Sequence, residues 1–155
     1  MKLPFIVLGA GGHAKVLVDA LRGLGTDIRG IVDADPAKHG QTLLDVPIIG
    51  DDRAVLASPT DSVLLVNGLG TVRASLQRRQ IYESFKSKGY QFATVVHGSA
   101  IVAPDVKLGE GAQVMAGAKC WPVCLKHDGV DFLVHAGGIH CREQRRQHRF
   151  RQCVA

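Results

Sequence analysis

The sequence predicts an α/β protein in which a Rossmann-like parallel βαβ domain precedes a short fragment of left-handed β-helix and an irregular tail. In the first part, β-branched apolar runs alternate with segments of helical spacing, which is typical of βαβ units. From residue 96, aliphatic residues recur every six positions, which is typical of a hexapeptide β-helix. Past residue 120 this phase is lost. We expect the three parts to span 1–94, 95–120 and 121–155.

Composition excludes several other classes of protein. Of the 155 residues, 46% are hydrophobic and 21% are charged, which is too apolar for disorder over most of the chain. No apolar run approaches the roughly 20 residues that a membrane span needs. The run Leu3–Ala10 follows Lys2 but is short and ends in glycines, so it predicts a buried strand rather than a signal peptide. We therefore expect a cytoplasmic protein without membrane association.

The first predicted unit is strand Pro4–Gly9, a glycine turn and helix Ala14–Leu24. The apolar positions of that helix recur at helical spacing and are Val16, Leu17, Ala20, Leu21 and Leu24. Further strands are predicted at Ile28–Val32, Val46–Ile49 and Ser62–Val66. A second helix is predicted at about 71–88, with Gly89 as its cap. Its apolar side is predicted to carry Leu76, Ile81 and Phe85. This alternation of strands and helices indicates a parallel sheet.

Three polar, mostly glycine-containing turns follow the predicted strands, at 9–13, 33–36 and 67–70. Because ligands of such sheets bind at the carboxyl ends of the strands, we expect these turns to meet in one site. The first turn opens a helix, where free N–H groups and the helix dipole favour a phosphate. His13 could donate to a pyrophosphate or sugar, and Asp33 could accept from a ribose hydroxyl. The alternative is that the glycines only form tight turns and His13 caps the helix.

The sequence is also compatible with a dinucleotide-binding site. The spacing Gly9-x-Gly11-x-x-Ala14 fits the dinucleotide fingerprint, with Asp33 about 20 residues further on. This pattern would also suit an NAD-dependent oxidoreductase. The short nucleotide domain and the six-residue repeat that follows it argue against that function.

The six-residue period begins at residue 96. One set of residues in phase is Val96, Val102, Leu108, Val114 and Cys120, and a second set is Ala100, Val106, Ala112 and Ala118. In a hexapeptide β-helix, such aliphatic and small residues face the narrow interior of a triangular coil. Residues 96–118 provide little more than one coil. Beyond them, Trp121-Pro122 interrupts the unit and Lys126 stands where an aliphatic residue is due.

A short nucleotide-binding βαβ domain followed by hexapeptide repeats resembles the bacterial sugar acetyltransferases that modify UDP-4-amino sugars, together with the related sialic-acid O-acetyltransferases. The resemblance covers roughly residues 4–118. It is carried by Gly9-Ala10-Gly11-Gly12-His13-Ala14-Lys15-Val16, Ile31-Val32-Asp33, Pro47-Ile48-Ile49-Gly50, Asn67-Gly68 and His97-Gly98-Ser99-Ala100. Together these segments are specific, although each alone is not.

The resemblance implies a UDP-sugar held by the N-terminal domain and acetyl-CoA as co-substrate, without a metal. The implied substrate-binding residues are Gly11, Gly12 and His13 at the pyrophosphate and sugar, Asp33 and Ala34 near the uridine, and Gly68 in the same cleft. Family members form homotrimers and bind acetyl-CoA between adjacent β-helices. A histidine of the later repeats acts as general base on the sugar amine or hydroxyl, assisted by a neighbouring acidic residue.

The catalytic residues stay unknown in this sequence. In the family, the general base should follow a segment resembling Asn-Thr-Gly and pair with an acidic residue. No such segment occurs here, and His127-Asp128 and His135 lie outside the repeat phase. The coils that would hold acetyl-CoA are also missing. We therefore expect this chain to bind a UDP-sugar without transferring an acetyl group, and we expect no well-defined trimer.

Residues 119–155 differ in character from the rest of the chain. They contain 7 Lys and Arg against 3 Asp and Glu, whereas 1–118 contain 12 against 11. If CGN codons encode arginine, a shifted reading frame across Arg142–Arg151 can include an Asn-Thr-Gly segment. We therefore hypothesise that a frameshift near 119–141 diverted a longer acetyltransferase gene.

Two other interpretations of residues 119–155 are possible. One is a zinc site built from four of the side chains Cys120, Cys124, His127, His135, His140 and Cys141, although their spacing is irregular. The other is nucleic-acid binding by Arg142–Arg151, which offers only Phe150 for stacking. We expect neither metal nor nucleic acid as a partner.

Overall fold

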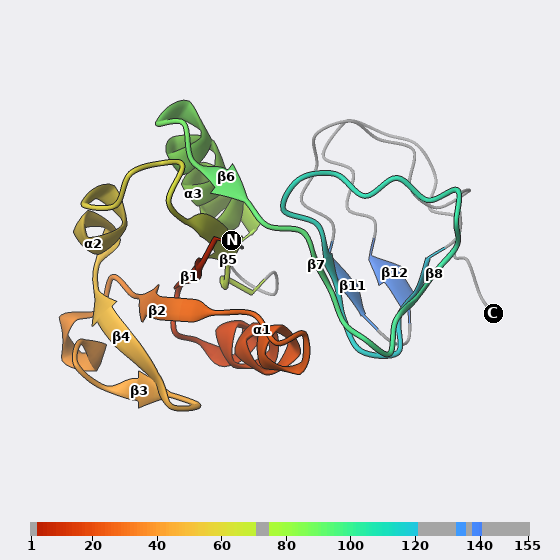
Figure 1. The fold of residues 1–155 in the computed structure, drawn as a ribbon, viewed down its shortest axis with the longest axis horizontal. Helices are drawn as coiled ribbons and strands as arrows, with labels where there is room; N and C mark the ends of the chain where they lie inside the picture. The colour runs from red at the N-terminus through yellow and green to blue at the C-terminus, as the bar shows by residue number, and fades with distance from the viewer. Residues whose placement is uncertain (1–2, 71–74, 121–132, 136–137, 141–155) are drawn as a thin grey trace. The chain divides into compact units, whose positions relative to one another are not determined.

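The computed structural model describes residues 3–70, 75–120, 133–135 and 138–140 (Figure 1). The chain divides into two compact units, Met1–Ala93 and Thr94–Ala155.

The first unit is an α/β domain. Its elements are β1 (Phe5–Leu8), α1 (Gly12–Gly23), β2 (Ile28–Val32), the 3-10 helix η1 (Pro36–Lys38), β3 (Thr42–Leu43), β4 (Val46–Gly50), α2 (Asp52–Leu56), β5 (Leu64–Asn67), α3 (Ser75–Ser87) and β6 (Gln91–Phe92). Among the described residues, one sheet has the strand order β3-β4-β2-β1-β5-β6. Only the β3–β4 pair in it is antiparallel. The predicted α/β class is confirmed, and η1, β3, α2 and β6 are elements that the sequence did not predict.

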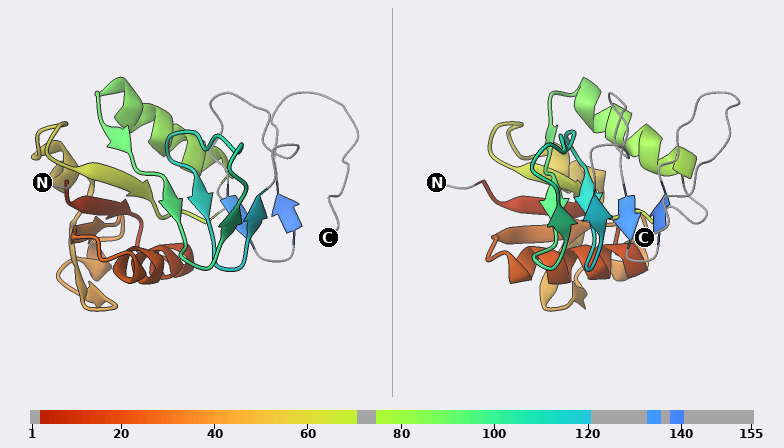
Figure 2. Two further views of the ribbon diagram at one scale, coloured as in Figure 1. Left: turned by 45° about the vertical axis from the view of Figure 1, so that its right-hand side comes forward. Right: turned by 90° about the vertical axis from the view of Figure 1, so that its right-hand side faces the viewer.

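The strand order reverses direction between β1 and β5. From β1 the chain moves outward through β2 to β4, then returns to the other side of β1 to form β5 and β6. Because crossovers between parallel strands are right-handed, the two directions put α1 and α3 on opposite faces of the sheet, as Figure 2 shows. The carboxyl ends of β1 and β5 therefore flank the topological switch point, where α/β sheets bind their ligands.

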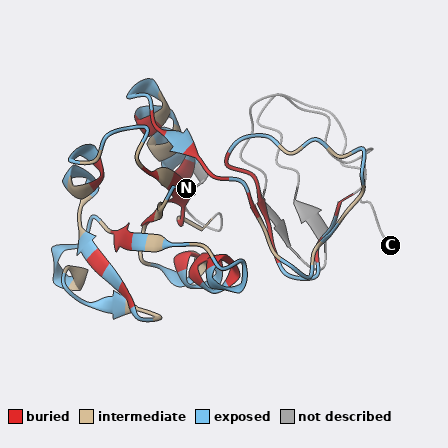
Figure 3. Cartoon of the chain, viewed as in Figure 1, coloured by how far each residue is buried: buried red, intermediate tan, exposed pale blue. Residues whose placement is uncertain are grey.

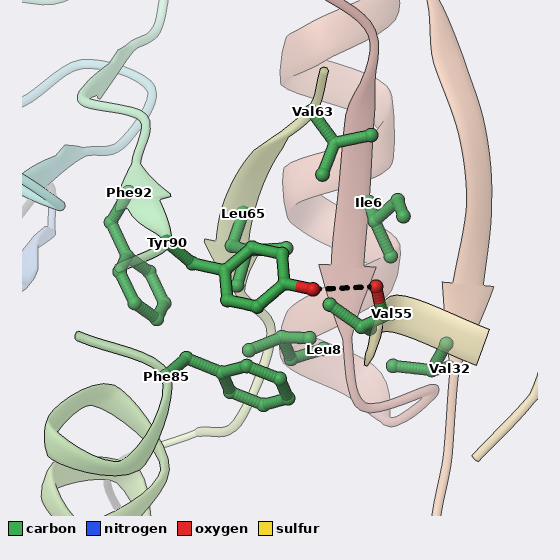
Figure 4. Close-up of a cluster of buried hydrophobic side chains, with 9 residues drawn as sticks. All are labelled: Ile6, Leu8, Val32, Val55, Val63, Leu65, Phe85, Tyr90 and Phe92. Atoms are coloured by element: carbon green, nitrogen blue, oxygen red, sulfur yellow. Dashed lines mark hydrogen bonds between the residues drawn. The ribbon is translucent and has the colours of Figure 1, made fainter. Parts of the chain in front are cut away.

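The α2 and α3 side of the sheet holds a core that includes aromatic side chains (Figure 4). Its buried members are Ile6, Leu8, Val32, Val55, Val63, Leu65, Phe85, Tyr90 and Phe92. The Tyr90 hydroxyl donates to the backbone oxygens of Val55 at 2.9 Å and Ser58 at 2.8 Å, so its polar end is satisfied inside this core. Since side chains alternate along a strand, Val7 points to the opposite face, which α1 covers.

The two main helices bury partly different residues from those predicted. In α1 the buried side chains are Ala14, Leu17, Val18, Ala20 and Leu21. Figure 3 colours the buried parts of the chain red. Val16 and Leu24, predicted on the apolar side, are 48% and 43% exposed. In α3, Leu76 is 63% exposed, whereas Arg78 is only 3% exposed and lies one and two helical turns before Ile81 and Phe85. The spacing of Arg78, not of Leu76, matches the buried side of this helix.

Gly89 follows the end of α3 and acts as its C-terminal cap, as the sequence predicted. The Gly89 backbone has φ +90°, a conformation that glycine adopts without strain. Its N–H donates to Lys86 O at 3.0 Å, and the Tyr90 N–H donates to Phe85 O at 3.1 Å. These two bonds form a Schellman motif, and the Phe85 and Tyr90 rings pack edge to face at 5.6 Å beside it.

The second unit contains short strands that fit a fragment of a β-helix. Strand β7 (Val95–Val96) pairs in parallel with β9 (Gln113–Val114), and β8 (Ile101–Val102) pairs in parallel with β10 (Lys119–Cys120). Partners in both pairs lie 18 residues apart, which is one coil of three hexapeptides. In Figure 1 the chain between these strands traces a triangular outline.

The interior of this coil is filled by the residues in six-residue phase. Buried Val114, Ala118 and Cys120 form its centre. The partly buried residues packed against them are Val96, Ala100, Val102, Val106 and Leu108. Ala112, the remaining residue in phase, is fully buried. These are the positions that the period placed inside the coil.

Two short strands lie in the region where the sequence predicted an irregular tail. Strand β11 (Leu133–His135) pairs in parallel with β9, with Leu133 opposite Gln113. This offset is 20 residues instead of 18, so the six-residue register is not kept. Strand β12 (Gly138–His140) is antiparallel to β11, unlike a further coil of a β-helix. The frameshift and nucleic-acid interpretations rest largely on residues outside the described ranges.

Candidate functional site

Three turns at the carboxyl edge of the first unit's sheet contact one another. They follow β1, β2 and β5, at the places that the sequence predicted. The Ala10 N–H donates to Asp33 Oδ2 at 2.7 Å, which joins the first turn to the second. The Gly68 N–H donates to Leu8 O at 2.7 Å, which joins the third turn to β1. The structure therefore brings the three turns together at the switch point.

The first turn leaves the N-terminus of α1 open. Gly9 turns the chain with φ +91°, and its N–H donates to Val32 O at 2.6 Å. Gly11 is the N-cap residue, and no side chain caps the helix. A Cβ built on Gly11 or Gly12 would meet no atom of the described residues within 4 Å. The first amides of a 12-residue helix are thus unprotected by a side-chain cap and positioned to hold an anion.

His13 is the second residue of α1 and is half-buried. The N-cap position itself is occupied by Gly11, one residue before the helix begins. A Cβ on Gly70 would lie 3.6 Å from the His13 Cβ, which places the third turn next to this residue. His13 therefore lies between the open helix N-terminus and the turn after β5.

Asp33 holds the first and second turns together. Its Oδ2 accepts from the Ala10 N–H and from Lys38 Nζ at 3.0 Å, and its Oδ1 accepts from the Asp35 N–H at 2.9 Å. The side chain is 12% exposed. A carboxylate offers about four acceptor positions, and three bonds are already present. The acidic residue of a dinucleotide fingerprint instead accepts from a ribose hydroxyl, so this arrangement differs from that pattern.

These contacts also set the charge of Asp33. Burial by itself raises the pKa of the carboxyl group. The hydrogen bonds from the N–H groups of Asp35 and Ala10, together with the hydrogen bond and charge of Lys38, outweigh burial and lower the pKa below its ordinary value. Asp33 is therefore a stable anion at neutral pH. Ala34 follows it on the exposed surface of the second turn.

Gly68 is required by packing in the third turn. A Cβ at this position would lie 2.7 Å from Leu8 O and 2.9 Å from Val7 Cγ1. The turn therefore approaches β1 more closely than any side chain allows. The next residue, Leu69, packs beside Gly9, since a Cβ on Gly9 would lie 3.3 Å from Leu69 Cδ1.

Two buried polar residues support the third turn, and the sequence reasoning assigned neither of these contacts. Arg78 Nη1 donates to the backbone oxygens of Asn67 at 3.0 Å and Leu69 at 2.6 Å. Asn67 Nδ2 donates in return to Arg78 O at 3.0 Å. The sequence does contain a signal for this contact. Arg78 lies three residues before Ile81 and seven before Phe85, which puts it on the same apolar side of the helix. A charged residue in that phase indicates a specific buried contact.

Comparison with known proteins agrees with this geometry. The family model of the PglD N-terminal domain matches residues 4–85, which include all three turns and Arg78. The chain belongs to the PglD N-terminal domain family. No curated protein sequence matches the chain.

Solved structures extend the likeness of this PglD-family chain beyond the matched domain. A mutant of perosamine N-acetyltransferase from Caulobacter crescentus, in complex with CoA and GDP-perosamine, is 34% identical with a TM-score of 0.67. PerB from the same organism, with the same ligands, is 36% identical with a TM-score of 0.65. The acetyltransferase domain of PglB from Neisseria gonorrhoeae, with acetyl coenzyme A, is 29% identical with a TM-score of 0.66.

These matches cover 77% of the present chain. The chain spans 54% of the two Caulobacter proteins and 56% of the Neisseria domain, so about half the length of each.

Among the described residues we identify neither a general base nor a metal site. They contain no group of three or more His, Cys, Asp or Glu side chains that could hold a metal ion. Of the zinc candidates, Cys124, His127 and Cys141 lie outside the described residues. Within the described ranges, no helix has the length and apolar character needed to cross a bilayer.

Proposed function

We propose that the first unit binds the nucleoside diphosphate part of a nucleotide sugar at the switch point between β1 and β5. The diphosphate would accept hydrogen bonds from the first N–H groups of α1, with Gly11 and Gly12 allowing close approach. His13 would donate to the diphosphate or the sugar. Asp33 and Ala34 would lie on the base and ribose side, and Gly68 would line the opposite wall.

The observation that carries this proposal is the open N-terminus of α1. Its N-cap residue has no side chain to cap it, and a Cβ built on Gly11 or Gly12 would meet no atom within 4 Å beyond the neighbouring residues and the helix's own backbone. The relatives named above that were solved with GDP-perosamine support a nucleotide sugar as the ligand. The sequence resemblance implies uridine as the base, whereas these relatives point to guanosine.

The acetyl donor in this proposal is acetyl-CoA, and the acceptor is an amino group on the bound sugar. The support is that the solved relatives are acetyltransferases in complex with CoA or acetyl-CoA. The sequence has no Asn-Thr-Gly-like segment that leads to a histidine paired with an acidic residue. We therefore expect residues 1–155 to bind the nucleotide sugar without acetylating it. Release of the CoA thiol from acetyl-CoA in the presence of a UDP- or GDP-linked amino sugar would contradict this expectation.

The substitution Gly11→Asp tests the binding site without removing a packing contact. An aspartate at the N-cap can accept from the first helical amides, so folding stability should stay equal or rise by a few tenths of a kcal/mol. The same carboxylate competes with and repels a phosphate. We expect the affinity for UDP or GDP, measured by isothermal titration calorimetry, to fall by about tenfold or more.

The matched control is Gly98→Asp, which adds the same charge at an exposed glycine of the second unit that also has free space for a Cβ. It should leave the nucleotide affinity unchanged. Equal affinities for wild type and Gly11→Asp would show that the anion does not bind at the N-terminus of α1.

A further inference from the structure

Arg78 is a buried cation in a position where the pattern of α3 calls for an apolar side chain. It is 3% exposed and shares a helix face with Phe85 of the aromatic core. Burying a guanidinium costs free energy unless its donors are satisfied and its charge serves a contact that a neutral side chain cannot make. The contacts of Arg78 therefore indicate what it contributes.

Two of those contacts lie in the turn after β5. One nitrogen, Nη1, donates to Asn67 O at 3.0 Å and to Leu69 O at 2.6 Å, which spans the turn across Gly68. The Asn67 side chain closes the ring by donating to Arg78 O at 3.0 Å and accepting from the Leu69 N–H at 3.3 Å. The backbone oxygens on both sides of Gly68 are thereby tied to one guanidinium group.

The same turn contacts the first turn at two points. The Leu69 side chain packs beside Gly9, and Gly70 lies beside His13. A shift of Leu69 or Gly70 would therefore move the backbone that presents the first amides of α1. Because Arg78 donates to the backbone of this turn, its effect on the amides of α1 would pass through the turn.

We propose that Arg78 is a positioning residue for the anion site, which fixes Leu69 and Gly70 against Gly9 and His13 so that the nucleoside diphosphate meets a rigid site. This inference rests on the proposed function. The planar guanidinium can span two carbonyl oxygens at once, whereas an ammonium group is a compact charge on a flexible stem. A lysine should therefore replace it only in part.

The test compares Arg78→Met and Arg78→Lys with Arg79→Met in titrations with UDP and GDP. Arg79 is the adjacent residue of the same helix, 61% exposed at its side chain and paired with Glu83, so its loss should leave affinity within about twofold of wild type. Arg78→Met should weaken binding by about tenfold or more, because charge-assisted hydrogen bonds are the strong ones. Arg78→Lys should recover part of that loss. Affinities are measured well below each variant's melting temperature, where circular dichroism shows it folded.

The variant Leu69→Ala tests whether the turn after β5 positions the first turn, and it changes a half-exposed side chain. It keeps the test decisive if Arg78→Met does not fold. It removes the side chain that packs beside Gly9 and should weaken nucleotide binding with little loss of stability. If wild type binds nucleotide and folded Arg78→Lys and Leu69→Ala bind it equally well, the inference is overturned while the proposed function stands. If wild type binds neither UDP nor GDP, the proposed function fails and the inference fails with it.

Discussion

At the scale of single residues, the candidate site depends on backbone groups more than on side chains. Gly68 approaches Leu8 O too closely for any Cβ, and Gly9 turns with a positive φ, while Gly11 and Gly12 leave open space. The charged side chains nearby, Asp33 and Arg78, hold turns together. The chain thus uses its buried charges to position N–H groups that an anionic ligand can reach.

The ionisation of Asp33 should make folding stability depend on pH in a defined direction. Because its pKa is lowered in the folded protein, the carboxylate stabilises the fold at pH values above the ordinary aspartate pKa of about 4. That contribution is lost as pH falls through the lowered pKa. We expect wild type to exceed Asp33→Asn in free energy of unfolding at neutral pH, with a difference that shrinks under acid conditions.

Urea unfolding at a series of pH values measures this difference. The matched control is Asp19→Asn on the exposed side of α1, which should change stability little at any pH. A constant difference between wild type and Asp33→Asn from neutral pH to below pH 4 would show that the hydrogen bonds of Asp33 do not depend on its charge.

At the scale of elements, the hexapeptide coil should separate inward from outward positions sharply. Val114 is fully buried in the coil interior, whereas Ile101 is 54% exposed on β8. Val114→Ala removes two buried methyl groups and leaves a cavity, so we expect a loss of about 2 kcal/mol. Ile101→Ala removes a larger group at an exposed site and should cost less than about 0.5 kcal/mol.

Urea or thermal unfolding that reports on the second unit provides the comparison. Similar losses for the two variants would mean that Val114 is not packed in a coil interior and that the six-residue period has no structural role.

Sequence patterns predicted the elements whose signal is local and repeated. The strand Ile28–Val32 was predicted with its observed bounds, and the interior of the coil follows the six-residue period. The elements that were missed are short, such as β3, β6 and α2, and depend on pairing or packing with distant segments. Leu76, predicted on the apolar side of α3, is exposed, and the buried position in phase with Ile81 and Phe85 is taken by Arg78, which is not apolar.

For the candidate site, the positions of the turns were predictable from the sequence, but the side-chain contacts between them were not. The glycine turns and their meeting at the carboxyl edge follow from parallel βαβ units, and the structure brings them together. The use of Asp33 as a link between turns could not be predicted, because it depends on Ala10, Lys38 and Asp35 converging on one carboxylate. The ring between Asn67 and Arg78 likewise joins a strand end to a helix 11 residues later.

At the scale of the whole molecule, the chain consists of two compact units with different features. The first unit, of the PglD N-terminal domain family, holds the candidate anion site, and the second holds the start of a coil. Because a ligand stabilises the unit that binds it, nucleotide should protect the first unit against unfolding, by about 2.7 kcal/mol when its concentration is 100 times Kd.

The central claim is that a nucleoside diphosphate binds at the first amides of α1, and backbone amide chemical shifts measured during titration with UDP, GDP and NADH test it most directly. We predict that UDP or GDP produces its largest shifts at Gly11, Gly12 and His13, with smaller shifts at Gly68, and that NADH does not. Shifts produced only by NADH, or nucleotide shifts that lie outside these turns, would contradict the account.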